Sequence, residues 1–414
     1  MYQPIKSIPV EGTFLSPVHI GTGQELDPFC SFIKEDRLYY FELSALLARL
    51  TDGQRNVFTK LLADGSLVEV RKFLAERVDP RRDSIGSIAV ARDIASEYAG
   101  KIDDQRNQLI FQPFFRNGHN FQPLLPGSSL KGAIRTAVID TLIQERNVSL
   151  SDRAKRDPRQ MEKEVLGHRD IDQDPFKALK CADITLPDDG TIIQRVYNYS
   201  ERSEKLTDLG LRIEMTKSHM EGTELGFESV LEFFEGYRNK KITTRDSEKK
   251  AIARYLTPEE ILTACRRFYT DNLKKEHEHF YRDSPYQATS EKLLRIADEL
   301  AVNECLLRIG RFTQAESKSI NRYRTVMVRG KDGLRPMDEG TTRNLAAGRY
   351  PMGWVKLKFA GVEGTAKAKP GYIHQSLSQN TPPTGRRVII SDTRKNDAPV
   401  DLSRLKDRYP VKGR

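Results

Sequence analysis

A glycine- and serine-rich stretch with two cations is the part of this sequence best suited to binding an anion. It reads Leu125-Pro126-Gly127-Ser128-Ser129-Leu130-Lys131-Gly132-Ala133-Ile134-Arg135. Glycines allow tight turns and close backbone approach, and serine hydroxyls can cap a helix. The first turn of the following helix has unpaired N–H groups that favour phosphate or carboxylate. Because Lys131 and Arg135 lie four residues apart, we expect these two cations to converge with the amides on one anion.

The same stretch does not fit a nucleotide-binding P-loop. That motif places Lys and then Ser or Thr around its second glycine in the order Gly-Lys-Ser/Thr. Here Lys131 precedes Gly132, and Ala133 and Ile134 follow it. No side chain is therefore placed to hold magnesium. The alternative that stays open is a strand–turn–helix connection whose cations only face solvent.

A second glycine motif lies near the N-terminus and reads Ser16-Pro17-Val18-His19-Ile20-Gly21-Thr22-Gly23. Together the two motifs resemble those of the RAMP superfamily of CRISPR proteins. More narrowly, the chain is similar to the fifth-subunit family of the type III-A (Csm) effector complex, in which a His-Ile-Gly-x-Gly turn precedes a Gly-Ser-Ser-Leu-Lys-Gly-x-x-Arg loop. Both motifs are intact here, in that order. The resemblance of the rest depends on order, on the length of 414 residues and on general pattern.

The resemblance implies both a fold and a function. The implied fold is α+β, with two ferredoxin-like (RRM-like) domains. The implied function is a non-catalytic RNA-binding subunit that caps the effector complex near the 3′ end of the guide RNA and supports guide-RNA maturation and antiviral defence. The implied partners are the guide RNA, other Csm subunits (especially the repeated backbone RAMP subunit and the small helical subunit) and host nucleases. From the two motifs, the expected RNA-contacting residues are His19, Gly21, Thr22, Gly23, Gly127, Ser128, Ser129, Lys131, Gly132 and Arg135.

A basic cluster in the second half of the chain adds four more candidates. They are Arg308, Arg311, Phe312 and Lys318. The resemblance implies a second glycine-rich loop here, but this sequence keeps only Gly310. We expect the cations to contact RNA and Phe312 to stack on a base. A basic loop that faces solvent is the alternative.

Two rival functions stay open. One is a metal-independent endoribonuclease in which His19 acts as general acid or base, with His119 as its most credible partner. The other is a different type III RAMP subunit, such as the one that binds the 5′ tag of the guide RNA. We expect neither a catalytic residue nor a metal or other cofactor, because no carboxylate or histidine cluster has workable spacing.

Composition sets the broad class. The formal net charge of +10, from 68 basic and 58 acidic residues, favours an anionic partner, and nucleic acid before membrane. The four cysteines form no Cys-x-x-Cys pair, which argues against a zinc site or a disulfide scaffold. No apolar stretch approaches the length of a signal peptide or a membrane span, so a cytoplasmic protein is expected.

The pattern along the chain predicts two domains, because 414 residues are too many for one compact core. We expect a first ferredoxin-like domain over 1–204 with a helical insertion over about 44–100, a second over 205–369, and a flexible basic tail over 370–414. The charged stretch 148–175 is predicted to be a loop. Thr257, Pro258 and Glu260 predict a capped helix start. A further helix is predicted from Ser290 to about Arg308.

Overall fold

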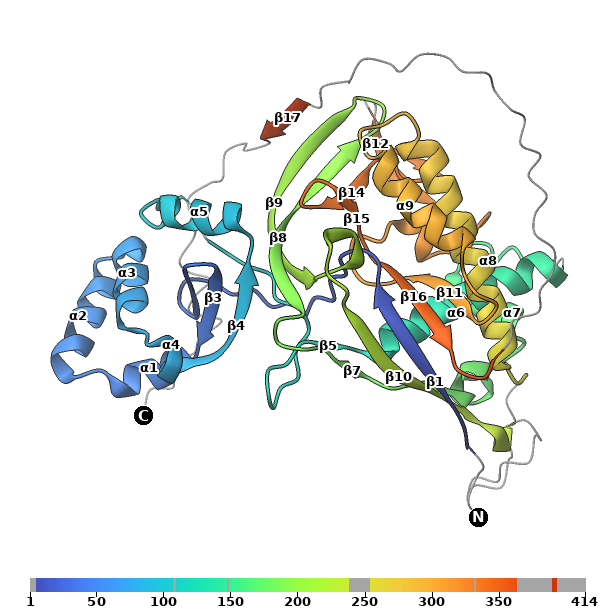
Figure 1. Ribbon diagram of the computed structural model, residues 1–414, viewed down its shortest axis with the longest axis horizontal. Helices are drawn as coiled ribbons and strands as arrows, with labels where there is room; N and C mark the ends of the chain where they lie inside the picture. Colours follow the sequence, from blue (N-terminus) through green and yellow to red (C-terminus); the bar gives the residue numbers. More distant parts are fainter. Residues whose placement is uncertain are drawn as a thin grey trace.

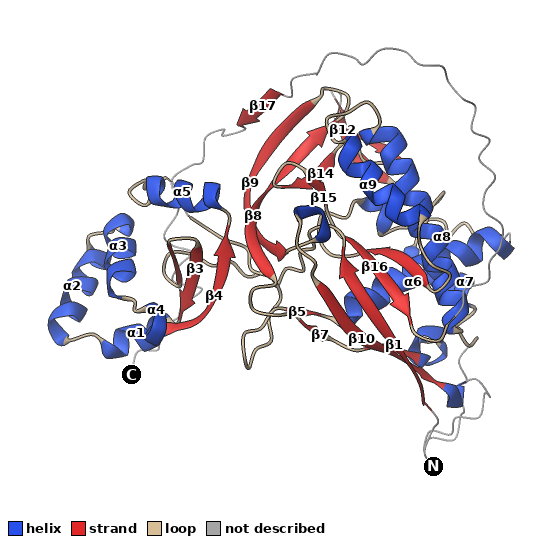
Figure 2. Cartoon of the chain, viewed as in Figure 1, coloured by secondary structure: helices blue, strands red, loops and turns tan. Residues whose placement is uncertain are grey.

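The chain forms a mixed α+β structure in which strands lie between two groups of helices (Figure 1, Figure 2). The computed structural model describes residues 5–106, 109–146, 149–237, 254–330, 333–362 and 389–392. Within these ranges the helices are α1 (Leu43–Arg49), α2 (Asp52–Ala63), α3 (Leu67–Arg77), α4 (Pro80–Asp83), α5 (Arg92–Lys101), α6 (Gly127–Arg146), α7 (Pro158–Leu166), α8 (Pro258–Glu276) and α9 (Gln287–Asp298). The strands are β1 (Ile5–Phe14), β2 (Ser31–Lys34), β3 (Arg37–Phe41), β4 (Ser84–Val90), β5 (Leu124–Leu125), β6 (Leu179–Cys181), β7 (Ile184–Thr185), β8 (Thr191–Ser200), β9 (Lys205–Thr216), β10 (Gly226–Phe234), β11 (Glu304–Arg308), β12 (Val326–Gly330), β13 (Gly333–Met337), β14 (Arg343–Ala346), β15 (Tyr350–Pro351), β16 (Trp354–Phe359) and β17 (Ile389–Asp392).

A five-stranded antiparallel sheet, in the order β11-β16-β1-β10-β6, carries the largest core. Successive side chains of a strand point to opposite faces, and along β1 it is Ile8, Val10 and Phe14 that are buried. They belong to the same hydrophobic cluster as the buried faces of α6 and α8. The two helices that follow the glycine-serine motif and the Thr257 cap are therefore fixed on this sheet.

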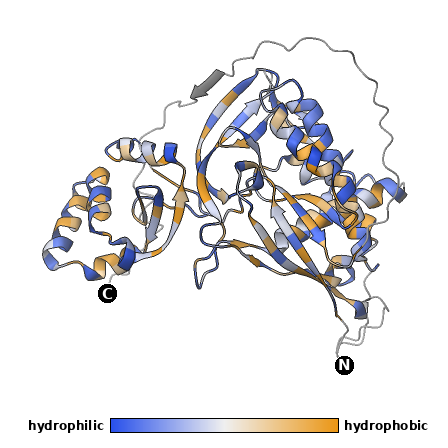
Figure 3. Ribbon diagram, viewed as in Figure 1, coloured by the Kyte–Doolittle hydropathy of each residue, from blue (hydrophilic) through white to orange (hydrophobic). Residues whose placement is uncertain are grey.

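An eight-stranded sheet connects this body to the N-terminal group of helices. Its central strand, β8, pairs along its whole length with β9. On its other side, β8 pairs with β4 in parallel orientation and with β14 in antiparallel orientation. Strands β3 and β2 extend the sheet beyond β4, and their buried residues pack with those of α1, α2, α3 and α5 in a separate cluster. Hydrophobic and hydrophilic residues are interspersed along α2 and α3 (Figure 3).

Several predicted elements are confirmed and several are corrected. Thr257 and Glu260 form the predicted capping box at the start of α8. The predicted helical insertion contains α1, α2, α3, α4 and α5, but Ser84–Val90 interrupts it as a strand. The predicted helix after Ser290 ends at Asp298, and Glu304–Arg308 forms β11. The predicted loop over 148–175 contains α7.

The expected domain boundary does not divide the sheets. Residues 204 and 205 fall at the turn of the β8–β9 hairpin. β1, from the first half of the chain, pairs with β10 and β16 from the second half. Segments 1–204 and 205–369 therefore share both large sheets and do not form two separate domains. The expected tail, 370–414, lies outside the described residues except for β17, which pairs in parallel with β9.

No helix within the described ranges is long and apolar enough to cross a membrane.

Candidate nucleic-acid interface

Three segments that are distant in sequence meet around a groove of about 630 Å³. The first is the His19 loop that follows β1, the second is the start of α6, and the third is the segment after β11. The lining residues are His19, Ile20, Gly21, Gly23, Ser128, Ser129, Gly132, Ala133, Thr136, Arg308, Ile309, Gly310, Arg311, Ser317 and Lys318. The two glycine motifs and the basic cluster predicted from sequence therefore do come together.

His19 forms part of the wall as a buried, neutral side chain. Only 1% of the residue is exposed, and its Nδ1 lies 2.6 Å from the backbone carbonyl oxygen of Glu214. Because a carbonyl oxygen only accepts, Nδ1 carries the proton and Nε2 keeps a lone pair. Burial is the main reason that the pKa of His19 is lowered from 6.5 to about 4; the bond to Glu214 opposes this change, and the nearby charge of Arg311 adds to it.

Glu214 connects the His19 loop to the segment that contains Phe114 and Arg116. Its side chain is fully buried and accepts hydrogen bonds from the Phe114 amide at 2.7 Å and from the Thr191 hydroxyl. Its carboxylate also forms an ion pair with Arg116. A buried carboxylate is tolerated when it is paired and hydrogen-bonded in this way. Through its carbonyl, the same residue fixes the His19 ring.

Gly310 allows the third segment to pass close to the His19 loop. Its φ is +90°, and a Cβ at this position would lie 2.5 Å from the carbonyl oxygen of His19. The next residue, Arg311, donates its backbone N–H to that same carbonyl at 2.9 Å. A side chain at 310 would therefore separate the two segments that form the groove.

Arg311 and Lys318 give the groove its positive charge. The guanidinium of Arg311 donates to the Gln112 amide oxygen at 2.6 Å and lies over the ring of Phe312. Within the described ranges neither Arg311 nor Lys318 forms an ion pair with a carboxylate. Partial burial lowers the pKa of Lys318, and the charges of Arg308 and Arg311 lower it further. Like charges held together without a counter-ion favour binding of an anion.

Arg308 also borders the groove, but its charge is already compensated. Its side chain is almost fully buried and pairs with Glu276 at 2.9 Å. Its Nε donates to the carbonyl oxygen of Met352 at 2.9 Å, and its guanidinium stacks on the ring of Trp354. Arg308 therefore stabilises the wall of the groove and offers little to a ligand.

Comparison with known proteins agrees with the two motifs. The family model of the RAMP superfamily matches residues 11–315, which include both glycine motifs and the groove as far as Arg311. The chain belongs to the RAMP superfamily.

Three individual proteins are similar to this chain in sequence or in fold. A protein of Methanocaldococcus jannaschii described as "CRISPR system Cms protein Csm5" is 27% identical over 265 residues, a match that spans 58% of each chain. One chain in a cryo-EM structure of a Csm–crRNA–target RNA ternary complex of a type III-A system is similar in fold, with a TM-score of 0.61, 20% identity and coverage of 85% of this chain and 100% of that one. The crystal structure of T. onnurineus Csm5 gives a TM-score of 0.54 at 18% identity, with coverage of 83% and 99%.

In this RAMP chain Lys131 and Arg135 do not converge with the loop amides, so that part of the sequence prediction is wrong. Lys131 Nζ donates to the carbonyl oxygen of Leu179 at 2.7 Å, and partial burial lowers its pKa. Arg135 pairs with Glu162 at 2.6 Å and with Asp174 at 2.8 Å, and it stacks on Phe176. Neither side chain lines the groove. The reason is the position of their partners, because Leu179, Glu162 and Asp174 pack beside α6 and bind both cations away from the groove.

The remaining predicted residues have different surroundings. The Gly127 amide donates to Asp183 at 2.7 Å, so a carboxylate of the chain itself occupies the start of α6; a Cβ on Gly127 would collide with the carbonyl oxygen of Cys181. The Thr22 hydroxyl accepts from the Gln24 amide, outside the groove lining. Phe312 is half-buried and packs against the cluster that contains Val196, Ile213 and Met215, and the Arg311 guanidinium lies over its ring. Contact of these residues with RNA stays a prediction.

Three further residues at or beside the groove, Glu214, Thr136 and Gln112, were not predicted from the sequence. Glu214 lies in Leu-Arg-Ile-Glu-Met-Thr, where a lone acidic residue stands among apolar ones near the end of a strand. Such a residue is a sign of a buried, paired carboxylate. Thr136 and Gln112 carry no comparable signal, because their roles depend on which segments pack together.

Proposed function

We propose that this chain is a non-catalytic RNA-binding subunit of a type III-A CRISPR effector complex and that its groove holds the phosphate backbone of the guide RNA. The single observation that carries the proposal is the meeting of both RAMP glycine motifs with Arg311 and Lys318 at one groove. The cations provide charge, Ser128 and Ser129 provide hydroxyl donors, and the exposed Gly132 leaves space for an RNA strand. Such contacts position RNA without reading its sequence.

The relatives support membership of such a complex. One structural neighbour is a chain of a Csm–crRNA–target RNA complex, and the curated relative is a Csm protein. We infer that the guide RNA, the repeated backbone RAMP subunit and the small helical subunit are its partners. Capping of the complex near the guide 3′ end, and support of maturation by host nucleases, belong to the same proposal.

The fold supports one ferredoxin-like unit that is assembled from distant segments. β1, α6, β6, β10, α8 and β16 follow the β-α-β-β-α-β order, and their strands lie in the spatial order β16-β1-β10-β6. This order supports a ferredoxin-like unit, with β11 added at one edge. We infer that the eight-stranded sheet derives from the second RAMP unit and carries the α1–α5 insertion.

The geometry favours binding over catalysis by His19. A general acid or base must reach the proton that it transfers, but the imidazole is buried and Nε2 is covered. Its pKa of about 4 keeps it neutral near pH 7. His119, the partner considered from sequence, lies on an exposed turn and is not among the groove residues.

Assembly of the chain with Csm partners and guide RNA tests the proposal. Arg311→Ala with Lys318→Ala is coexpressed with tagged Csm partners and guide RNA, and the amounts of copurified chain and RNA are measured. We expect both to fall several-fold relative to the parent. Lys292→Ala with Lys356→Ala removes the same charge outside the groove and serves as the control. Parent-like recovery of chain and RNA with the Arg311/Lys318 variant contradicts the proposal.

A further inference from the structure

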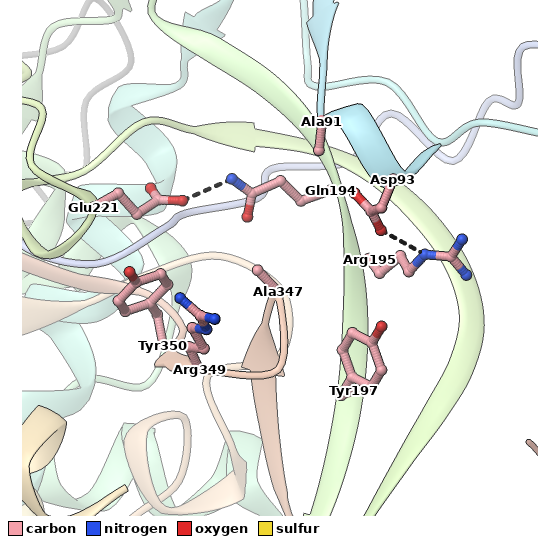
Figure 4. Close-up of a pocket in the computed structure, with 9 residues that line it drawn as sticks. All are labelled: Ala91, Asp93, Gln194, Arg195, Tyr197, Glu221, Ala347, Arg349 and Tyr350. Carbon is pink, nitrogen blue, oxygen red and sulfur yellow. Dashed lines mark hydrogen bonds and ion pairs between the residues drawn. The ribbon is translucent and has the colours of Figure 1, made fainter. Parts of the chain in front are cut away.

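A second cavity, of about 330 Å³, lies between β8, the start of α5, the short 3-10 helix at His219–Glu221 and the β14–β15 turn. It shares no lining residue with the groove described above. Its volume is within the range of pockets that hold small ligands. Four separate segments build it, and Figure 4 shows their side chains around the space.

The pocket contains a buried hydrogen-bond acceptor without a donor. Gln194 is 8% exposed, and its Nε2 donates to Glu221 Oε1 at 2.7 Å. Its Oε1 has no partner within the described ranges. In Figure 4 the amide nitrogen is turned to Glu221 and the oxygen is turned away from it. Buried amide oxygens are normally satisfied, so this oxygen and the neighbouring carboxylate suit a ligand that supplies N–H donors.

Only one of the two arginines in the lining is available to a ligand. Arg195 is bound by Asp93 at 2.9 Å, by Asp208 at 2.9 Å and by Glu97 at 2.6 Å. Arg349 is exposed and forms no ion pair within the described ranges. Its free guanidinium suits a phosphate group.

Aromatic rings and a fixed turn complete the site. Tyr197 and Tyr350 are half-buried and line the same pocket, and Figure 4 shows Tyr350 beside Arg349. Ala347 and Gly348 both have positive φ and form a tight two-residue turn, which the Arg349 N–H closes onto Ala346 O at 2.9 Å. The Ala347 N–H donates to the carbonyl oxygen of Arg195 at 2.9 Å, which fixes the turn to β8. The backbone that carries Arg349 and Tyr350, and the side chain of Gln194, are therefore fixed without a ligand.

We propose that this pocket binds one nucleotide whose base carries an exocyclic amino group. The base lies against Tyr350 and Tyr197 and donates to Gln194 Oε1 and the Glu221 carboxylate, and its phosphate pairs with Arg349. Aromatic faces accept any base, while Gln194 Oε1 lacks an N–H donor; the Glu221 carboxylate already accepts from Gln194 and Ser218 and offers its remaining lone pairs. The nucleotide is either free or an unpaired residue of a bound RNA strand. The site is separate from the groove, so the inference does not depend on the proposed function.

The test uses full-length protein and calorimetric titration with AMP, CMP and GMP, with ribose 5-phosphate as the control that lacks a base. Arg349→Ala and Tyr350→Ala are each expected to weaken nucleotide binding about fivefold or more, the lower end for loss of one base–aromatic stack. Arg202→Ala removes an exposed charge at the β8–β9 turn, outside the pocket, and is expected to leave binding unchanged. If Tyr350→Ala does not fold, Arg349→Ala still tests the proposal, because Arg349 is exposed.

A second arm distinguishes the source of the nucleotide. If free nucleotides do not bind, but Arg349→Ala weakens the affinity for single-stranded RNA more than Arg202→Ala does, the ligand is an unpaired RNA base. The proposal is overturned if ribose 5-phosphate binds as tightly as AMP. It is equally overturned if the pocket variants match Arg202→Ala with both nucleotides and RNA.

Discussion

At the scale of single residues, the groove depends on two buried titratable groups that hold its loops. His19 donates to the carbonyl of Glu214, and the Glu214 carboxylate binds the Phe114 amide and Arg116. Neither side chain is free to contact a ligand. Their contribution is to fix the backbone from which Arg311 and Gly21 border the groove, because Arg311 N–H binds His19 O and a Cβ on Gly21 would lie 2.8 Å from His19 Nε2.

The lowered pKa of His19 predicts a loss of stability in acid. Since the folded pKa is about 4 and the unfolded value is 6.5, the unfolded chain binds the extra proton first as pH falls. The stabilisation is complete above pH 6.5 and is lost progressively between 6.5 and about 4. It is on the order of 3 kcal/mol, from about 1.4 kcal/mol per pKa unit. His19→Asn keeps a donor for Glu214 O but does not titrate, so its unfolding free energy should change less between pH 7 and 4.5. Equal pH dependence in the parent and the variant argues against a buried neutral His19.

Glu214→Gln is predicted to destabilise the fold by about 3 kcal/mol, because it leaves Arg116 without its buried counter-charge. Chemical denaturation measures this loss, provided that the dependence of unfolding free energy on denaturant concentration has the same slope in parent and variant. Glu228→Gln, at an exposed position of β10, removes the same charge and should change stability by less than about 0.5 kcal/mol. Similar stability of the two variants contradicts the role assigned to Glu214.

At the scale of elements, the loop after β11 stores backbone strain beside the groove. Gly310, Phe312 and Gln314 all have positive φ, and Gln314, with φ +62° and ψ +160°, lies in a region that only glycine occupies readily. In sequence this loop keeps one glycine, Gly310, and lacks the others that the family resemblance implies. The structure shows that the chain nevertheless adopts a backbone suited to glycine at each of these three positions.

Gln314→Gly is therefore predicted to be more stable than Gln314→Ala by about 1 kcal/mol, since both lose the same side chain and only glycine relieves the strain. Thermal unfolding of the two variants gives the difference. A more stable alanine variant would show that the loop does not hold this conformation.

Sequence patterns predicted elements best where local chemistry decides them. The Thr257 capping box was predictable, because its donor and acceptor lie three residues apart. Helix α7 was missed although Asp157 caps it and Gly167 ends it, because charged residues obscured Met161 and Val165. Strand β11 was missed because Cys305, Leu306 and Leu307 are all fully buried, and a short apolar run does not distinguish strand from helix.

At the scale of the whole molecule, the fold joins segments that no local pattern connects. The pairing of β1 with β10 and β16 brings the His19 loop beside Arg311, across almost three hundred residues of sequence. The two glycine motifs could be recognised from sequence, and so could the basic cluster. The direction in which Lys131 and Arg135 point could not, because it depends on where Leu179, Glu162 and Asp174 pack.

The salt dependence of RNA binding by the purified chain tests the central claim most directly. Each cation that neutralises a phosphate contributes about one unit to the slope of log affinity against log salt. We expect Arg311→Ala with Lys318→Ala to reduce that slope by about two units and to weaken binding across RNA sequences. We expect Lys131→Ala, whose ammonium is already bonded to Leu179, to leave the slope unchanged. A parent-like slope for the Arg311/Lys318 variant, or a reduced slope for Lys131→Ala, would contradict the groove as the phosphate-binding surface.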